Sequence, residues 1–379
     1  MKHSTRADID PFIVMDVMEA ARAAEAAGRD IIHMEVGQPG TPAPKGARLA
    51  VAAAMEAGTL GYTTAMGLPA LRERIAGLYR DRHGLDIDPA RVIVTAGASG
   101  AFLLAFSAAF DAGERVALGL PGYPSYRQIL RALSLSPIGL PTDATTRFQP
   151  TPAMVPDDVA GLIVASPSNP TGTMLNADEL GGLIARTHEI GAKFISDEIY
   201  HGLDFGRPSI SALEFSDDVI VVNSFSKYFS MTGWRVGWLV VPEDMVRVID
   251  RLAQNMFICP PHASQVAALA AFDCGDELDA NRAVYAANRQ LLLEGLPSAG
   301  FGQIAPPDGA FYVYADVSDM TGDSVAFARR ILDQAGVAVT PGVDFDPSRG
   351  LTTLRFSYAG PTADIVEGID RLRRFLGSI

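Results

Sequence analysis

Lys227 is the residue whose type and position most clearly invite chemistry. The chain has only four lysines among its 31 lysines and arginines, and Lys227 directly follows an apolar run at 219–223. An amine that is desolvated and close to other cations has a lowered pKa, and it then becomes a nucleophile for Schiff-base formation. The alternative is a solvated lysine at the end of a strand, so Lys227 alone does not decide the chemistry.

Groups suited to a phosphate lie near this lysine and in one glycine-rich turn. Ser224 precedes Lys227 by three residues, and Arg235, in SMTGWRVG, follows it by eight. A hydroxyl, a guanidinium and turn N–H groups together make a phosphate pocket. The turn at 97–100 (GASG) is expected to open a helix, whose N-terminal N–H groups favour an anion. Taken alone, that turn is equally compatible with an ordinary strand-to-helix connection.

Three further polar segments contain candidate ligands of a cofactor or substrate. Asp197, Glu198 and Tyr200 lie together in SDEIY. A carboxylate buried in an apolar sheet needs a cationic partner, such as a protonated pyridine nitrogen; a surface loop is the alternative. Asn169 in SPSNPTG could donate to a ligand oxygen or only start a turn. Arg355, in an apolar run, is compatible with a substrate carboxylate or a structural ion pair.

The elements that would position these residues alternate along the chain. Short apolar runs separated by helical patterns predict an α/β fold with a mostly parallel sheet. Such sheets bind ligands at the carboxyl ends of their strands. The polar segments GASG, SPSNPTG, DEIY and SFSK each follow one of these runs, namely VIVT at 92, GLIVA at 161, KFIS at 193 and VIVVN at 219.

Composition excludes several classes of protein. A net charge of −13 argues against a nucleic-acid surface, which needs clustered cations. Cys259 and Cys274 cannot form a disulfide framework, and no Cys/His cluster has the spacing of a metal site. The uncharged stretch 92–110 is interpreted as a buried strand, turn and helix, not as a membrane span. With no apolar leader in the first residues, we expect a cytoplasmic protein.

Several motifs resemble one known family. SPSNPTG, SDEIY, SFSK followed by MTGWRVG, and LRFSYAG together resemble class I/II pyridoxal-phosphate (PLP)-dependent aminotransferases of fold type I, the aspartate aminotransferase superfamily. The resemblance extends from GQPG at 37 to the C-terminal helix. It implies a large domain with a seven-stranded, mostly parallel sheet between helices (46–280) and a smaller α+β domain (1–45 and 281–379). It also implies a homodimer with active sites at the interface.

The resemblance implies a role for each matching residue at the reaction centre. Lys227 would hold PLP as a Schiff base and carry the proton away from the substrate Cα. Asp197 would pair with the pyridinium nitrogen, while Tyr200 and Asn169 would hydrogen-bond the phenolic oxygen. Tyr123 would stack on the ring, although some relatives have tryptophan there.

Other matching residues would hold the phosphate and the substrate. The phosphate would be bound by Gly97, Ala98, Ser99, Ser224, Arg235 and a neighbouring subunit's Tyr62. Relatives often have a second glycine where Ala98 stands, but backbone donors tolerate this change. The substrate's α-carboxylate would be bound by Gly37, Asn169 and Arg355.

The predicted activity is transfer of an amino group between an L-amino acid and a 2-oxo acid by a ping-pong mechanism. The main alternative is a PLP-dependent lyase or decarboxylase, which would use nearly the same residues. A nucleotide-dependent oxidoreductase is disfavoured, because no tyrosine lies four residues before Lys45, Lys193 or Lys227. A PLP-binding sensor module is disfavoured, because no basic helix-turn-helix segment precedes residue 30.

Overall fold

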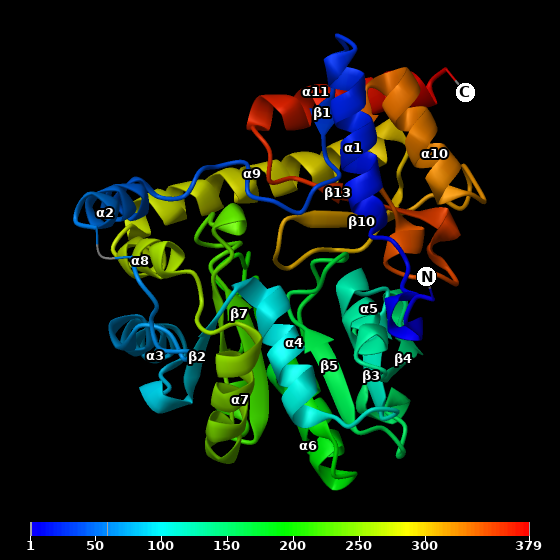
Figure 1. Cartoon of the computed structure of the whole chain (residues 1–379). Coiled ribbons are helices and arrows are strands. Elements are labelled where there is room, and N and C mark those ends of the chain that lie inside the picture. The colour runs from blue at the N-terminus through cyan, green and yellow to red at the C-terminus, as the bar shows by residue number, and fades with distance from the viewer. Residues whose placement is uncertain (1, 59, 379) are drawn as a thin grey trace.

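The computed structural model describes residues 2–58 and 60–378. A seven-stranded sheet forms its centre (Figure 1). All of its strands are parallel except β8, which is antiparallel to both of its neighbours. This confirms the predicted α/β fold. In spatial order the strands are β2 (Val92–Thr95), β8 (Gly237–Val240), β7 (Val219–Ser224), β6 (Lys193–Asp197), β5 (Gly161–Ala165), β3 (Arg115–Leu120) and β4 (Ser136–Pro141).

Helices cover both faces of this sheet, because successive strand residues point to opposite faces and both faces are apolar. In β2, for example, Val92 and Val94 belong to one buried cluster and Ile93 belongs to another. The helices over the first face are α2 (Lys45–Glu56), α3 (Pro69–His83), α6 (Ala177–Glu189) and α8 (His262–Ala271). Those over the second are α4 (Gly97–Ala109), α5 (Pro124–Ala132) and α7 (Glu243–Met256).

Both ends of the chain meet in a second, smaller layer (Figure 1). The strand β1 (Ile32–His33) pairs in parallel with β11 (Val337–Ala338). Next to them lies an antiparallel sheet of β12 (Thr340–Pro341), β13 (Thr353–Ser357), β10 (Tyr312–Asp316) and β9 (Gln303–Ile304). The accompanying helices are α1 (Ile13–Ala26), α9 (Gly275–Ala299), α10 (Ser324–Arg330) and α11 (Thr362–Leu376). The domain limits at 45/46 and 280/281 stay predictions; α9 runs unbroken through the second of them.

Three details of the central sheet and its covering helices add to the sequence expectations. The GASG segment was expected as a turn before a helix at 101–110, but α4 already begins at Gly97, so the segment forms the first helical turn. The edge strand β4 contains two prolines, and edge strands tolerate proline because one side of their backbone has no neighbour. Helix α6 begins at a capping box, in which Asn176 and Glu179 each satisfy the other's backbone N–H.

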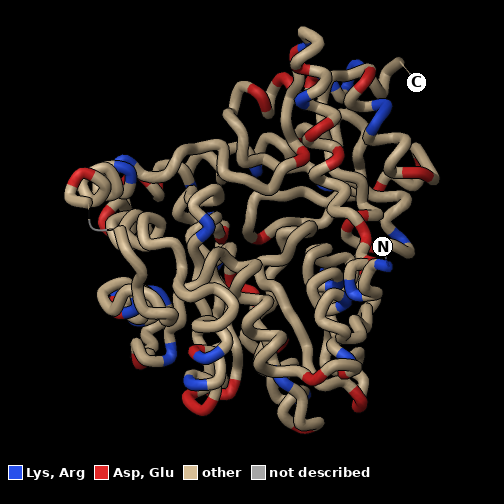
Figure 2. The backbone as a smooth tube through the Cα atoms, in the orientation of Figure 1, with Lys and Arg blue, Asp and Glu red and all other residues tan. Residues whose placement is uncertain are grey.

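Charged residues of both signs are distributed along the chain, with many in the outer helices and loops (Figure 2). The apolar stretch 92–110 forms β2 followed by α4, as expected; β2 is buried throughout, and α4 is buried on the face that packs on the sheet. Within residues 2–58 and 60–378, no helix has the length and apolar character needed to cross a membrane.

Candidate active site

A cavity of about 190 Å³ opens at the carboxyl ends of the central strands, between the sheet and the smaller layer. The first two turns of α4 and the start of α1 close its sides. The structure brings most of the predicted site residues together here. Those lining the cavity are Gly37, Ala98, Ser99, Tyr123, Asn169, Asp197, Tyr200, Ser224, Lys227, Arg235 and Arg355.

The amine of Lys227 lies inside this cavity. Its Nζ donates to the carbonyl oxygen of Gly37 at 2.5 Å and lies 5.5 Å and 5.7 Å from the ring centres of Tyr200 and Phe311. Burial lowers the pKa of Lys227 to about 7, and the positive charge of Arg355 acts in the same direction. A substantial fraction of the amine is therefore neutral, and able to act as a nucleophile or base, at neutral pH.

The carboxyl group of Asp197 lies at the end of β6 and is only 2% exposed. It accepts hydrogen bonds from the Tyr126 hydroxyl and, at 3.2 Å, from the backbone N–H of Ile199. Burial raises the pKa of Asp197 to about 6, although these two bonds and the nearby Lys227 act against the rise. A positively charged ring nitrogen would supply the close cationic partner that this carboxylate lacks.

Donors suited to a phosphate gather at the beginning of α4. The residue before this helix, Ala96, provides no side-chain cap, so the first N–H groups of α4 have no capping side chain. Gly97 has φ +72°, and a Cβ there would lie 2.6 Å from Nη2 of Arg235, so the guanidinium lies directly against the helix terminus. The hydroxyls of Ser224 and Ser226, 2.8 Å apart, complete this side of the cavity.

Arg355 lies at the other end of the cavity and is 2% exposed. Its Nη1 donates to Asn169 Oδ1 at 2.9 Å and its Nη2 donates to the backbone carbonyl of Glu35. The guanidinium also stacks over the rings of Tyr312 and Phe345, at 4.4 Å and 4.8 Å. Among the described residues no carboxylate lies within 4 Å of it, and its Nε has no hydrogen-bond partner. The structural ion pair left open by the sequence is therefore not formed within this part of the chain.

Two predicted residues do not line the cavity. Gly97 lies behind it, against Arg235, where it permits the close approach described above. Tyr62 lies elsewhere and is 83% exposed, so within this chain it contributes nothing to the site. That position agrees with the expectation that Tyr62 serves a neighbouring subunit, but a single chain does not test it.

Several residues of the cavity were not predicted. Tyr126 bonds Asp197, and Tyr312 bonds the hydroxyl of Tyr200 at 2.7 Å. Tyr126 lies in the same PGYPSY segment as Tyr123, three residues on. Tyr123 is the N-cap residue of α5, and the two rings pack edge-on with their centres 5.3 Å apart. The second tyrosine of this short segment was therefore a usable signal. Tyr312 comes from the smaller layer, and nothing in its local sequence indicates which strand end it would meet.

The residues present fit PLP in the chemistry that they offer. A buried amine that can lose its charge, a buried carboxyl group, an N–H cradle with an arginine, and a tyrosine ring surround one cavity. Tyr123 packs edge-on against Phe12, with ring centres 5.8 Å apart, and is itself a wall of the cavity. Each part corresponds to one group of the cofactor: aldehyde, ring nitrogen, phosphate and ring face.

Comparison with known proteins agrees with this geometry. Residues 29–372 match the family model for aminotransferase class I and II. A valine–pyruvate aminotransferase of Mycobacterium tuberculosis is 48% identical over 380 residues, covering 98% of each chain. A crystal structure from Silicibacter pomeroyi is 64% identical and covers 100% of both chains with a TM-score of 0.96. Thermus thermophilus aspartate aminotransferase is 30% identical, with a TM-score of 0.93 over 99% of each chain.

The chain belongs to the aminotransferase class I and II family. It has the aspartate aminotransferase fold, and enzymes of this family use PLP as their cofactor. The aminotransferase activity predicted from the sequence motifs is confirmed, and the lyase or decarboxylase alternative is set aside.

Proposed function

We propose that this aminotransferase moves the amino group between a small neutral L-amino acid of the valine type and a 2-oxo acid such as pyruvate. The observation that carries the proposal is the lining of the substrate end of the cavity. Apart from Arg355, its wall near α1 consists of the apolar side chains Phe12, Val14, Met15 and Val36. The activity printed for the M. tuberculosis relative, valine–pyruvate aminotransferase, supports the same substrate class.

The charges of the cavity also support a neutral side chain. Its lining within the described chain contains three cations, Lys227, Arg235 and Arg355. Lys227 would hold the cofactor's aldehyde carbon and Arg235 its phosphate, which leaves Arg355 as the one cation of this chain's described lining that is available to the substrate. A dicarboxylate substrate needs a second cation for its side-chain carboxylate, because a buried unpaired charge is strongly disfavoured.

Substrate orientation follows from Arg355. Its guanidinium can bind the α-carboxylate through two parallel N–H groups, which fixes the direction of the bound amino acid. Asn169 Oδ1 and the Glu35 carbonyl hold the guanidinium in place. This clamp would place the Cα–H bond near Nζ of Lys227, the base that removes the proton.

Bound PLP supplies an electron sink for the charge that develops when the Cα proton leaves. Lys227 Nζ would accept that proton and return it one atom along, since a pKa of about 7 suits both directions at neutral pH. Asp197 would keep the ring nitrogen protonated. Tyr200 and Asn169 would orient the phenolic oxygen, and Tyr123 the ring. The phosphate would be anchored by donors at Gly97, Ala98, Ser99, Ser224 and Arg235. Gly37 would assist substrate binding.

The experiment is a panel of amino donors and 2-oxo acids assayed with the holoenzyme. We expect kcat/KM for valine or alanine with a 2-oxo acid to exceed that for aspartate by about tenfold or more, the cost of one unpaired charge in the cavity. Initial rates at several fixed acceptor concentrations should give the parallel lines of a ping-pong mechanism. Lys227→Ala is the negative control and should lack the visible absorption of a lysine-bound cofactor. A preference for aspartate would reject the neutral-substrate proposal.

We further propose a homodimer in which each chain lends Tyr62 to its partner's active site. Large exposed apolar side chains support this, because four of them occur in two segments near Tyr62: Leu49, Met55, Met256 and Ile258. A 2.8 Å contact between His262 Nδ1 and the Gly61 carbonyl brings these two segments together. Sedimentation should give twice the chain mass, and Tyr62→Phe should weaken PLP binding without dissociating the dimer. A monomer with full activity would contradict this arrangement.

A cytoplasmic location is part of the same proposal. Cys259 and Cys274 are both partly buried and free, which suits a reducing compartment. Cell fractionation checks this, and recovery of the enzyme in a periplasmic fraction would contradict it.

A further inference from the structure

A second cavity, of about 430 Å³, lies behind the active site. Two short segments border both cavities. In the segment after β6, Asp197 and Tyr200 face the active site whereas His201 lines the second cavity. In the segment after β7, Lys227 lines the active-site cavity, whereas Tyr228 lines the second cavity. The end of α3 and the start of α9 complete the second cavity, which the aminotransferase reaction does not use.

Two arginines of this second cavity have no acidic partner. Arg82, at the end of α3, donates from Nη1 to the His201 carbonyl at 3.2 Å and lies 4.4 Å from the ring centre of Tyr228. Burial lowers the pKa of Arg82, which means that its charged form is poorly solvated. The side chain of Arg282, on α9, makes no hydrogen bond to residues 2–58 or 60–378. Neither guanidinium has a carboxylate within 4 Å in residues 2–58 and 60–378, whereas Arg207 nearby has Asp308 at 3.6 Å.

The carboxylates near these arginines are bound to other groups. Asp204, the acidic residue of the cavity lining, accepts from the backbone N–H and the hydroxyl of Ser209, at 2.7 Å and 2.9 Å. Asp279 accepts from the Tyr228 hydroxyl at 3.1 Å. Glu214 lies 3.1 Å from His83 Nδ1. Asp204 and Asp279 therefore act on Arg82 only at longer range.

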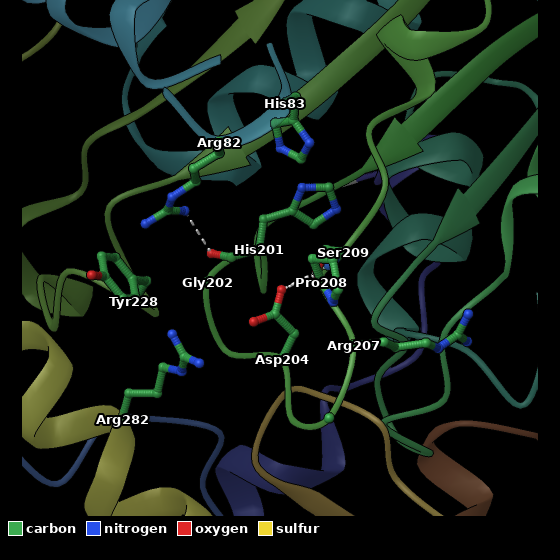
Figure 3. A pocket seen from close by; sticks show the side chains of 11 residues that line it. Arg82, His83, His201, Gly202, Asp204, Arg207, Pro208, Ser209, Tyr228 and Arg282 are labelled. Atoms are coloured by element: carbon green, nitrogen blue, oxygen red, sulfur yellow. Dashed lines mark hydrogen bonds between the residues drawn. The ribbon is translucent and has the colours of Figure 1, made fainter. Parts of the chain in front are cut away.

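The two unpaired arginines face the same space. Figure 3 shows Arg82 entering from one wall and Arg282 from the opposite wall, both directed toward the region beside Tyr228, while Arg207 points away. Two like charges that face each other across a cavity repel, and the largely buried Arg82 also lacks the ion pair that would offset its desolvation. An anion between them would remove both costs.

We propose that this second cavity binds the phosphate group of a small molecule, held between Arg82 and Arg282. A phosphate offers acceptor oxygens in several directions and can accept forked N–H pairs from two opposed guanidinium groups, whereas a carboxylate offers two oxygens in one plane. The Tyr228 ring, the two histidines and the loop that contains Asp204 and Ser209 line other parts of the wall.

The shape of the cavity suits such a ligand. Its volume lies within the range of small-molecule sites, roughly 300–1,000 Å³, and leaves space beyond the phosphate itself. Gly202 forms part of the wall with φ +90°, and a Cβ there would lie 2.9 Å from both Arg82 Nη1 and Tyr228 Cδ2. Glycine at this position therefore permits the close contact of Arg82 with Tyr228 that directs the guanidinium.

Calorimetric titration of the holoenzyme tests the proposal, because bound PLP already fills the cofactor's phosphate site. The ligands are inorganic phosphate and glycerol 3-phosphate. We expect one saturable site per chain, and Arg282→Gln and Arg82→Gln should each weaken binding by about tenfold or more, as expected for loss of a charge-assisted contact. Arg251→Gln, an exposed arginine on α7, is the matched control and should bind like the wild type.

The two ligands distinguish the sources of the phosphate group. Tighter binding of glycerol 3-phosphate identifies a phosphorylated metabolite, and equal or weaker binding identifies free phosphate; either supports the site. Arg282 is exposed on its helix, so Arg282→Gln remains decisive even if Arg82→Gln fails to fold. Equal affinity in the wild type and Arg282→Gln, or no saturable binding at millimolar concentrations, would overturn the proposal.

Discussion

Asp197 and Lys227 share one buried cavity, and their surroundings shift their two pKa values toward each other. Burial raises the pKa of Asp197 to about 6 and lowers that of Lys227 to about 7. Each group is therefore close to losing its charge at neutral pH, because neither has a strong partner within the chain. A bound ligand that carries a positive nitrogen next to Asp197 would restore the carboxylate, which couples cofactor binding to the charge state of the site.

Tyr126 controls how far Asp197 is neutralised. Its hydroxyl donates to Asp197, and this bond holds the pKa of the carboxyl group lower than burial alone would set it. Tyr126→Phe should raise the pKa of Asp197 further. It should also weaken PLP binding to the apoenzyme by about tenfold, which corresponds to the free energy that a hydrogen bond to a charged group contributes. Titration followed by absorbance measures this affinity. Tyr314→Phe, a buried tyrosine bonded to Thr353, is the control; an unchanged affinity in Tyr126→Phe would contradict the role.

Most of the predicted site residues could be found from sequence because they follow apolar runs. Asp197 and Ser224 end strands β6 and β7, and parallel strands bring such ends to one edge. Contacts between layers could not be found in this way. The pairing of Tyr200 with Tyr312 joins residues 112 positions apart, and no periodicity or composition encodes that distance.

At the scale of elements, helix α1 depends on a distant carboxylate. Its first residues have no side-chain cap of their own. Instead, the carboxyl oxygens of Asp344 accept from the N–H groups of Ile13 and Val14, both at 3.3 Å. These bonds satisfy two of the N–H groups that a helix leaves free at its beginning. Because Phe12, Val14 and Met15 line the substrate cavity, this anchor also shapes the site.

Asp344→Asn should loosen α1, since the charge that complements the helix N-terminus is lost. We expect faster proteolytic cleavage before residue 29 and a several-fold higher KM for the amino donor, with a smaller change in kcat. Limited proteolysis with mass spectrometry and steady-state kinetics measure the two effects. Asp364→Asn, a partly exposed aspartate in the first turn of α11, is the control. Equal cleavage rates in both variants would show that Asp344 does not anchor α1.

The elements that sequence patterns predicted are those whose burial is regular. Strand β7 is buried at all six positions, and its first four residues appear as the uninterrupted apolar run VIVV. Strand β4 (SPIGLP) has mostly exposed or partly exposed residues and two prolines, so no such run marks it. The two-residue strands β1 and β11 are too short for any periodicity, and only the folded chain brings them together.

For the whole molecule, the central sheet buries one carboxyl group that the reaction does not use. Glu198 accepts from Ser211 Oγ, Ser196 Oγ and the N–H of Ala212, but it has no cationic partner strong enough to offset its burial. Burial raises the pKa of Glu198 to about 8. The folded protein therefore binds this proton more tightly than the unfolded chain, in which the pKa is near 4.5.

This difference predicts how stability changes with pH. Glu198 contributes fully below pH 4.5, and its contribution is lost as the pH rises toward 8, because the unfolded chain has then released the proton and the folded chain has not. Between pH 5 and 7 the loss should be about 2 to 3 kcal/mol, at about 1.36 kcal/mol per pH unit. Lys227 acts in the opposite sense, but only above pH 7 in the apoenzyme, since its pKa is lowered from 10.5 to about 7.

Glu198→Gln removes the titrating group and should flatten this dependence. Urea unfolding of wild type and variant at pH 5 and pH 7 gives the difference in the free energy of unfolding, and restricting the range to pH 7 keeps the contribution of Lys227 out. Asp197 titrates in both proteins, so subtraction isolates Glu198. Glu189→Gln, at an exposed position on α6, should behave like the wild type. If wild type and Glu198→Gln lose equal stability between the two pH values, Glu198 is ionised in the folded protein and a cation must reach it.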